Sequence, residues 1–112
     1  MNTILLQKSC DLYRHFEKLI LQFPKKDRYG LGLKTENSIL RLIEFIITAE
    51  QTVPVLKCRA LIDASVKSET IKILLRLAME KRLIKETNYF ALSEKLIEIG
   101  KMIGGWRRSL QR

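Results

Sequence analysis

The amino-acid sequence predicts an all-α protein, an antiparallel up-down four-helix bundle in which residues 1–112 form a single domain. Three observations support this prediction. Apolar residues recur at intervals of three and four positions nearly throughout the chain, which is the spacing of one helix face. Only two prolines and five glycines interrupt the pattern. The connections between the predicted helices are short, which favours antiparallel neighbours.

The first helix is predicted from about Asn2 to Phe23, where Pro24 interrupts it. Proline is tolerated in the first turn of a helix, so the second helix begins near either Lys25 or Leu33, and the pattern does not decide between them. The second helix has an apolar face wider than one partner helix covers, which indicates a central helix or contact with a second chain. Its two apolar stripes are Ile39, Leu42, Ile46, Ala49 and Val53, and beside them Leu40, Ile43 and Ile47.

The third helix is predicted from about Val55 to Arg82, after the boundary that Pro54 sets. Its pattern is weakest at residues 65–68, where a kink is compatible with the sequence. A short turn at residues 83–88 follows, with Thr87 as the predicted N-cap of the last helix. The last helix has the most regular stripe, a coiled-coil-like seam of about three heptads. This seam consists of Tyr89, Leu92, Leu96, Ile99, Ile103, Trp106 and Leu110.

The chain is strongly basic, with 21 Lys and Arg against 12 Asp and Glu and a net charge of +9. Residues 1–56 carry 8 basic and 6 acidic groups, whereas residues 57–112 carry 13 basic and 6 acidic groups. The excess therefore lies mainly on the third and fourth helices. Such an excess favours polyanionic partners, and contact with phosphate would depend on salt and largely ignore base sequence.

The basic residues gather in four clusters: at the first connection, on one face of the third helix, where that helix ends, and at the C-terminus. Each cluster also has an ordinary explanation, because helical ion pairs and the negative end of a helix dipole both attract cations. Five aromatic residues fall on or near apolar stripes, so base-stacking platforms are not indicated. They are Tyr13, Phe16, Phe45, Tyr89 and Trp106, the last expected in a core or interface. The nine candidate contacts for nucleic acid or a partner protein are Lys72, Arg76, Lys81, Arg82, Arg107, Arg108, Lys25, Lys26 and Arg28.

The sequence predicts no enzymatic activity, no cofactor and no metal site. Cys10, Cys58 and His15 are too few for a four-ligand zinc site, and both thiols are expected to be reduced and half-buried. Gly30 and Gly32 complete no dinucleotide loop, because no strand precedes them. No uncharged stretch reaches the roughly 18 residues of a membrane span, and the N-terminus lacks a signal-peptide pattern. We therefore expect a cytoplasmic protein without membrane association.

Two parts of the chain carry more distinctive motifs. The first is Phe-Pro-Lys-Lys-Asp-Arg-Tyr-Gly-Leu-Gly at residues 23–32, followed by Glu-Asn at 36–37 and Leu-Ile-Glu at 42–44. The second is Leu-Leu-Arg-Leu-Ala at residues 74–78, Tyr89, and Glu-Ile-Gly-Lys-Met-Ile-Gly-Gly-Trp at 98–106. From about Tyr13 to Leu110 the chain resembles Avd proteins, the accessory variability determinants of diversity-generating retroelements. The related four-helix proteins encoded in ribosomal RNA intervening sequences share the architecture but match these motifs less well.

The resemblance implies a non-enzymatic homopentamer of four-helix bundles that binds the retroelement's reverse transcriptase, RNA and possibly DNA, and supports mutagenic complementary-DNA synthesis. A basic i,i+4 pair of the family maps onto Lys72 and Arg76. The first of the pair is Lys in place of Arg, and Lys cannot form the bidentate fork, so a phosphate role is retained better than planar recognition. Gly100 and Gly104 would let another helix approach closely, in the same chain or in a second copy.

Two other hypotheses stay open from the sequence. One is a structural oligomeric four-helix bundle of the ribosomal RNA intervening-sequence type. The other is a general protein-interaction module without specific nucleic-acid binding, whose charge keeps it in solution. Titration of labelled RNA at two salt concentrations separates both from the first hypothesis, because only phosphate contact predicts binding that weakens steeply with salt.

Overall fold

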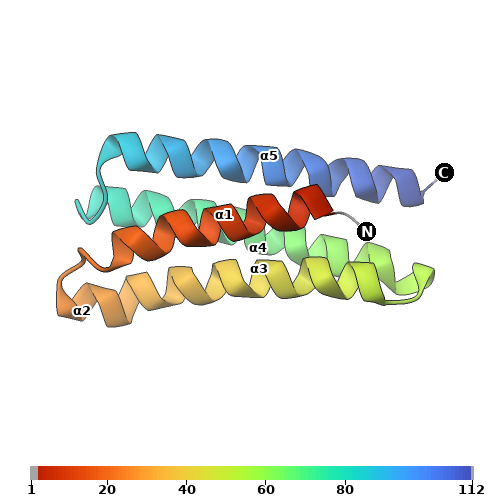
Figure 1. Ribbon diagram of the computed structural model, residues 1–112, viewed down its shortest axis with the longest axis horizontal. Helices are drawn as coiled ribbons and strands as arrows, with labels where there is room; N and C mark the ends of the chain where they lie inside the picture. Colours follow the sequence, from red (N-terminus) through yellow and green to blue (C-terminus); the bar gives the residue numbers. More distant parts are fainter. Residues whose placement is uncertain (1–2, 112) are drawn as a thin grey trace.

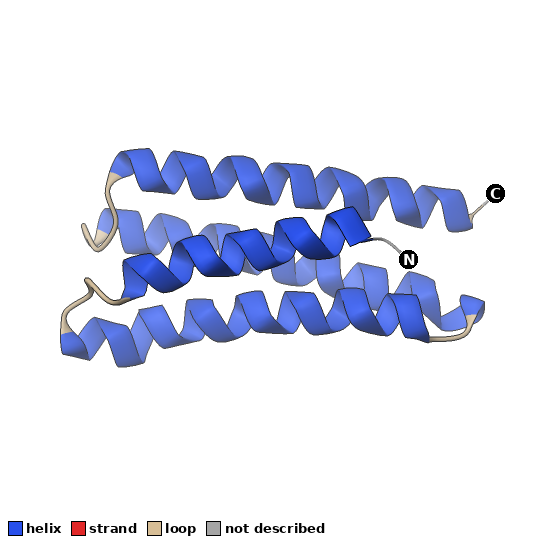
Figure 2. Ribbon diagram, viewed as in Figure 1, coloured by secondary structure: helices blue, strands red, loops and turns tan. Residues whose placement is uncertain are grey.

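The computed structural model describes residues 3–111, and its regular elements there are all helical (Figure 2). Four long helices are joined by short connections, and the second of them is preceded by a short helical segment and a π-helical turn. In chain order the elements are α1 (Thr3–Ile20), α2 (Lys25–Asp27), η1 (Arg28–Gly32), α3 (Leu33–Gln51), α4 (Pro54–Glu80) and α5 (Glu86–Leu110).

The helices form an antiparallel up-down bundle, about 46 Å long and 20–22 Å across. The chain reverses direction at each connection, so that α1 and α4 run in one direction and α3 and α5 run in the opposite direction (Figure 1). Helix α1 packs against α3 and α5, and α4 packs against the same two helices, so α1 and α4 lie diagonally across the bundle. The predicted four-helix fold is confirmed.

The buried core consists largely of the stripes predicted from the sequence. On α4 the six residues that recur at intervals of three and four positions are all buried: Leu61, Ala64, Ser68, Ile71, Leu75 and Ala78. On α5 the seam is buried from Leu92 to Ile103, and Tyr89 and Trp106 pack against it half-buried. Val53 is 56% exposed, because it lies in the α3–α4 connection, beyond the part of the bundle that α1 covers (Figure 1).

The second helix begins at Lys25, but its first eight residues are not one regular helix. Gly30 has non-helical backbone angles (φ −97°, ψ −106°), and residues 28–32 form the π-helical turn η1. Gly32 is buried, and a Cβ atom there would lie 2.9 Å from the Ile20 side chain and 3.0 Å from the Asp27 carbonyl oxygen. Glycine at this position thus lets η1 approach the end of α1 closely.

Two other predicted boundaries differ in the structure, and the weakest predicted segment of α4 is regular. Helix α1 ends at Ile20 rather than Phe23, because residues 21–23 form a turn that still buries the Phe23 ring. The prediction that Thr87 caps the last helix was wrong: α5 begins at Glu86 after an extended Lys85, without a side-chain cap. Helix α4 continues through residues 65–68 as a single α-helix.

Helix α4 carries a second apolar stripe that faces away from the core. Its members are 38–80% exposed and are spaced at intervals of seven and four residues, which places them on one face. We call this set the outer stripe of α4; it consists of Val55, Ile62, Val66, Ile73 and Leu77. On α3, the second predicted apolar stripe is only partly exposed to solvent. Ile43 packs against the core, while Leu40 and Ile47 are about 40% exposed.

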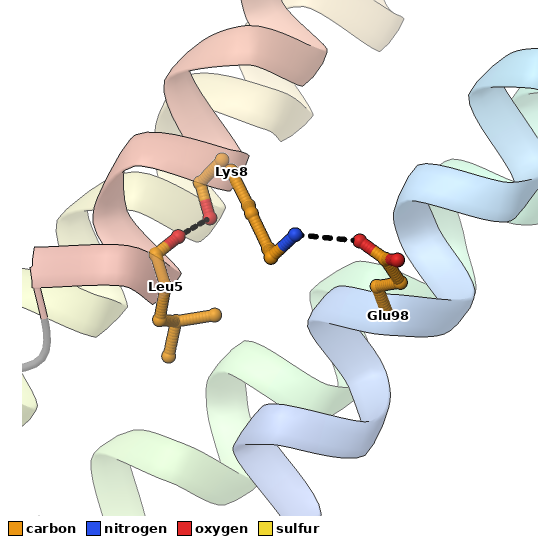
Figure 3. A network of polar contacts seen from close by, with 4 residues as sticks. Leu5, Lys8 and Glu98 are labelled. Carbon is orange, nitrogen blue, oxygen red and sulfur yellow. Dashed lines mark hydrogen bonds and ion pairs between the residues drawn. The ribbon is translucent and has the colours of Figure 1, made fainter.

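An ion pair between Lys8 and Glu98 joins α1 to α5 (Figure 3). The Lys8 ammonium lies 2.7 Å from a Glu98 carboxylate oxygen and donates a hydrogen bond to it. This bond and the charge of Lys8 lower the pKa of Glu98 below its ordinary value. The Lys8 side chain is 37% exposed and that of Glu98 is 61% exposed, so solvent screens the pair and its contribution to stability is small.

We predict opposite effects of alanine at two glycines. Gly32→Ala should lower the free energy of unfolding by about 1 kcal/mol, because the new methyl group overlaps Ile20 and the Asp27 carbonyl and this outweighs the better helix propensity. Gly100→Ala, where nothing lies within 4 Å of the new Cβ, should raise it by about 0.5–1 kcal/mol. Urea denaturation followed by circular dichroism measures both. Equal effects of the two substitutions would contradict the close approach at Gly32.

Candidate nucleic-acid interface

Two of the predicted basic clusters lie together at one end of the bundle, where the α1–α2 and α4–α5 connections meet (Figure 1, left). The Lys81 ammonium lies 2.8 Å from a carboxylate oxygen of Asp27 and joins the two connections. Around this ion pair lie four exposed cations, which we call the loop-end cluster: Lys25, Lys26, Arg82 and Lys85. Since Lys81 and Asp27 neutralise each other, the charge presented at this end comes mainly from that cluster.

Arg82 occupies a backbone conformation that favours glycine. Its φ is +60°, and it directly follows the C-cap of α4. The Leu83 amide donates to the Ala78 carbonyl across this turn, a pattern in which glycine is the common residue. A side chain in the left-handed region costs about 1–2 kcal/mol. Residues held in such conformations concentrate at functional sites, so this position is consistent with a role for the guanidinium.

Arg28, also predicted as a contact, is engaged within the protein. Its guanidinium donates to the carbonyl oxygens of Leu21 at 3.1 Å and Phe23 at 3.4 Å, in the turn after α1. Its Nε is buried and has no partner among the described residues. Arg28 thus supplies donors to carbonyls that the end of α1 leaves unpaired, a structural role.

Lys72 and Arg76 project from one face of α4, as their spacing predicted, and this face lies on the side toward α5. They line a shallow groove of about 280 Å³ together with apolar and polar residues of both helices. Lys72 lies 3.1 Å from Glu69, whereas Arg76 is exposed and has no ion pair within residues 3–111. The groove is completed by Glu69, Ile73, Tyr89, Ser93 and Ile97.

Arg107 and Arg108 lie at the opposite end of the bundle from the loop-end cluster, because α5 runs its full length between them (Figure 1). Arg107 is half-buried, and its Nε is buried without a partner among the described residues. Arg108 is exposed beside Gly104. The nine predicted contacts therefore occupy three separate places: the loop end, the side of α4, and the far end of α5.

Sequence reasoning missed a further group of basic residues between α1 and α5. Arg14, His15, Lys18 and Lys95 line a hollow together with Asp11. The Lys95 ammonium donates to Nδ1 of His15 at 3.1 Å, so the proton of the neutral ring lies on Nε2, which donates to Oδ1 of Asn88 at 3.3 Å. The signal was absent from the sequence because His15 and Lys95 lie 80 positions apart.

The five aromatic residues that the sequence placed on apolar stripes lie as expected, but two other aromatic residues are exposed. Tyr13, Phe16, Phe45, Tyr89 and Trp106 are buried or packed against the core. Burial, with the nearby carboxylates of Glu36 and Glu17, raises the pKa of Tyr13. Tyr29, by contrast, is 64% exposed at the η1 turn, and Phe90 is 55% exposed on α5.

The described residues offer neither a metal centre nor a membrane span. Within residues 3–111 no group of three or more His, Cys, Asp or Glu side chains is placed to hold a metal ion. Cys10 and Cys58 are free thiols, half-buried as predicted. In the part of the chain that the structure describes, each helix is too short or too polar to cross a bilayer.

Comparison with known protein families gives one clear result. The sequence profile of a family described as bAvd-like matches residues 3–110. Comparison with curated proteins gives no match. The profile covers nearly the whole chain, including both motif regions that resembled Avd proteins, and the fold is the four-helix bundle that this resemblance implied. The chain therefore belongs to the bAvd-like family.

Proposed function

We propose that this protein is a non-enzymatic accessory protein of a diversity-generating retroelement. It acts in the cytoplasm as a homo-oligomer, a ring of five copies, and binds the element's reverse transcriptase together with template RNA or cDNA to support mutagenic reverse transcription. Membership of the bAvd-like family supports the accessory role. The observation that carries the nucleic-acid part is that, within residues 3–111, exposed cations without an ion pair lie at the loop end and, as Arg76, beside α4, on a chain of net charge +9.

The outer stripe of α4 supports the oligomeric part of the proposal. Five apolar side chains of one helix face solvent in the single chain, and their spacing at seven and four residues is that of a helix packing seam. Lys72 and Arg76 flank this stripe on the α5 side. A ring assembled through α4 would bring the cations of neighbouring copies close together, which would strengthen attraction of a long polyanion.

Reversing the charge of Lys72 and Arg76 tests the proposed function. The double variant Lys72→Glu, Arg76→Glu should bind single-stranded RNA at least tenfold more weakly at low salt, because two phosphate contacts are lost. The salt dependence of the affinity should decrease as well. Fluorescence anisotropy of a labelled oligonucleotide at two salt concentrations measures this, and circular dichroism verifies folding.

The matched control is Arg14→Glu, Lys18→Glu on α1, diagonally across the bundle. This pair has the same i,i+4 spacing, also includes one residue in an i,i+3 ion pair, and changes the net charge equally. It should lower RNA affinity less than the α4 pair does. Equal losses would assign the effect to net charge alone, and absence of RNA binding by the unaltered protein at low salt would reject the proposed function.

Arg82 should show opposite effects on stability and binding. Arg82→Gly should raise the free energy of unfolding by about 0.5–1 kcal/mol, because glycine adopts the left-handed conformation without strain. It should also weaken RNA binding and lower the salt slope by about one phosphate contact. Arg82→Ala should weaken binding equally without the gain in stability. Unchanged RNA affinity in Arg82→Gly would remove this residue from the interface.

The outer stripe of α4 should determine the oligomeric state. Size-exclusion chromatography with light scattering should give five copies for the unaltered protein and a monomer for Val66→Glu, Ile73→Glu. Leu40→Glu, Ile47→Glu on α3 is the matched control, because these residues have the same seven-residue spacing and similar exposure. The control should remain oligomeric. If only the α3 variant dissociates, the contact between copies lies on α3, the helix that the sequence indicated, and not on the outer stripe of α4.

A further inference from the structure

The hollow beside the η1 turn is lined by both aromatic and basic side chains. It measures about 530 Å³ and lies between η1, α3 and α4. It combines one exposed aromatic ring, one partly exposed leucine, an amide, a hydroxyl and three cations. The lining residues are Tyr29, Gly30, Leu33, Lys34, Asn37, Ser38, Arg41 and Lys67.

The backbone of η1 is what places Tyr29 at this hollow. Its neighbour Leu31 packs against the core, and Gly32 is buried against Ile20, so the turn is fixed on its inner side. Gly30, between Tyr29 and Leu31, interrupts the helical geometry, and a Cβ atom placed on it would meet nothing within 4 Å. Tyr29 consequently lies on the outer side of the turn, 64% exposed, where its ring is not covered by the core.

The charge around the hollow is positive and partly unpaired. Arg41 is engaged with Glu44 at 2.6 Å and stacks on the Phe45 ring at 4.8 Å. Asp63, one turn before Lys67 on α4, lies 3.8 Å from Arg59. Within residues 3–111 neither Lys34 nor Lys67 has an ion pair, so both ammonium groups are available to an anionic ligand.

From these observations we propose that the η1 hollow is a subsite for one unstacked nucleotide of single-stranded RNA or DNA. The Tyr29 ring stacks on the base, Lys34 and Lys67 contact the flanking phosphates, and Asn37 offers an amide to the base edge. An aromatic face beside free cations is the combination that single-strand binding proteins use. The assignment rests on the proposed nucleic-acid function and deepens it, because it selects single strands over duplexes.

Tyr29→Ala and Tyr29→Phe in the full-length protein test the subsite. Anisotropy with a labelled single-stranded oligonucleotide should show roughly tenfold weaker binding for Tyr29→Ala, within the range that one lost stacking contact produces. Tyr29→Phe should bind within twofold of the unaltered protein. Binding of a duplex of the same sequence should not change in Tyr29→Ala, because paired bases are already stacked. Phe90→Ala, at the other exposed aromatic residue, is the matched control and should leave single-strand binding unchanged.

Salt dependence separates stacking from phosphate contact. Tyr29→Ala should keep the slope of log affinity against log salt, whereas Lys34→Gln, Lys67→Gln should reduce it by about 1.4, the value for two phosphates of a single strand. If the unaltered protein binds single strands and Tyr29→Ala binds equally well, the subsite is wrong and the proposed function stands. An equal loss in Phe90→Ala or in duplex binding also overturns it. If the unaltered protein binds no nucleic acid, the proposed function itself fails.

Discussion

The architecture depends on each helix burying one apolar stripe around a shared axis. Helix α4 is the helix that keeps the most apolar side chains exposed under this constraint. Its inner stripe is fully buried between α3 and α5, yet five more apolar side chains face outward. A bundle of four helices can cover only one face of each helix. Burying the outer stripe in a contact would contribute on the order of several kcal/mol per copy. The single chain thus buries its core but leaves the apolar outer stripe exposed to solvent, which is the physical reason for proposing assembly through α4.

A second constraint concerns how the excess positive charge is divided. Some cations act within the protein. Arg28 donates to carbonyls after α1, and Lys57 donates to the Ala49 carbonyl at 2.7 Å and the Glu50 carbonyl at 3.3 Å at the end of α3. Lys81 joins two connections through Asp27. Of these groups, Arg28 and Lys57 satisfy carbonyls near helix ends that would otherwise lack partners. Among the described residues, the cations that remain exposed and without an ion pair have no structural role to account for them, and they lie chiefly at the loop end, at Arg76 beside α4 and at the η1 hollow.

The fold could be predicted from the sequence because stripe periodicity reports directly on burial. The stripe from Leu61 to Ala78 and the seam from Leu92 to Ile103 are both buried. Helix ends were less predictable, because Thr87 has a good capping side chain but the N-cap of α5 lies two residues earlier, at Lys85. The site was only partly predictable. Spacing placed Lys72 and Arg76 on one face, but no local pattern could show that Asp27 and Lys81 meet, that Arg28 turns inward, or that His15 contacts Lys95. Tyr29 was missed because its exposure depends on the π-helical turn, which a regular helical pattern does not reveal.

Nucleic-acid binding and assembly would not be independent if both use α4. Lys72 and Arg76 lie on the α5 side of the outer stripe, and Lys67 lines the hollow on the α3 side. A contact through the stripe would bring such cations of neighbouring copies together, and their repulsion would oppose assembly at low salt. A bound polyanion would remove that repulsion, so RNA would favour the ring and the ring would favour RNA by the same coupling free energy. Added salt would then have two opposite effects: it would promote assembly of the free protein and lower the affinity for RNA. This opposition distinguishes a nucleic-acid-binding ring from a purely structural oligomer, in which salt would influence assembly alone.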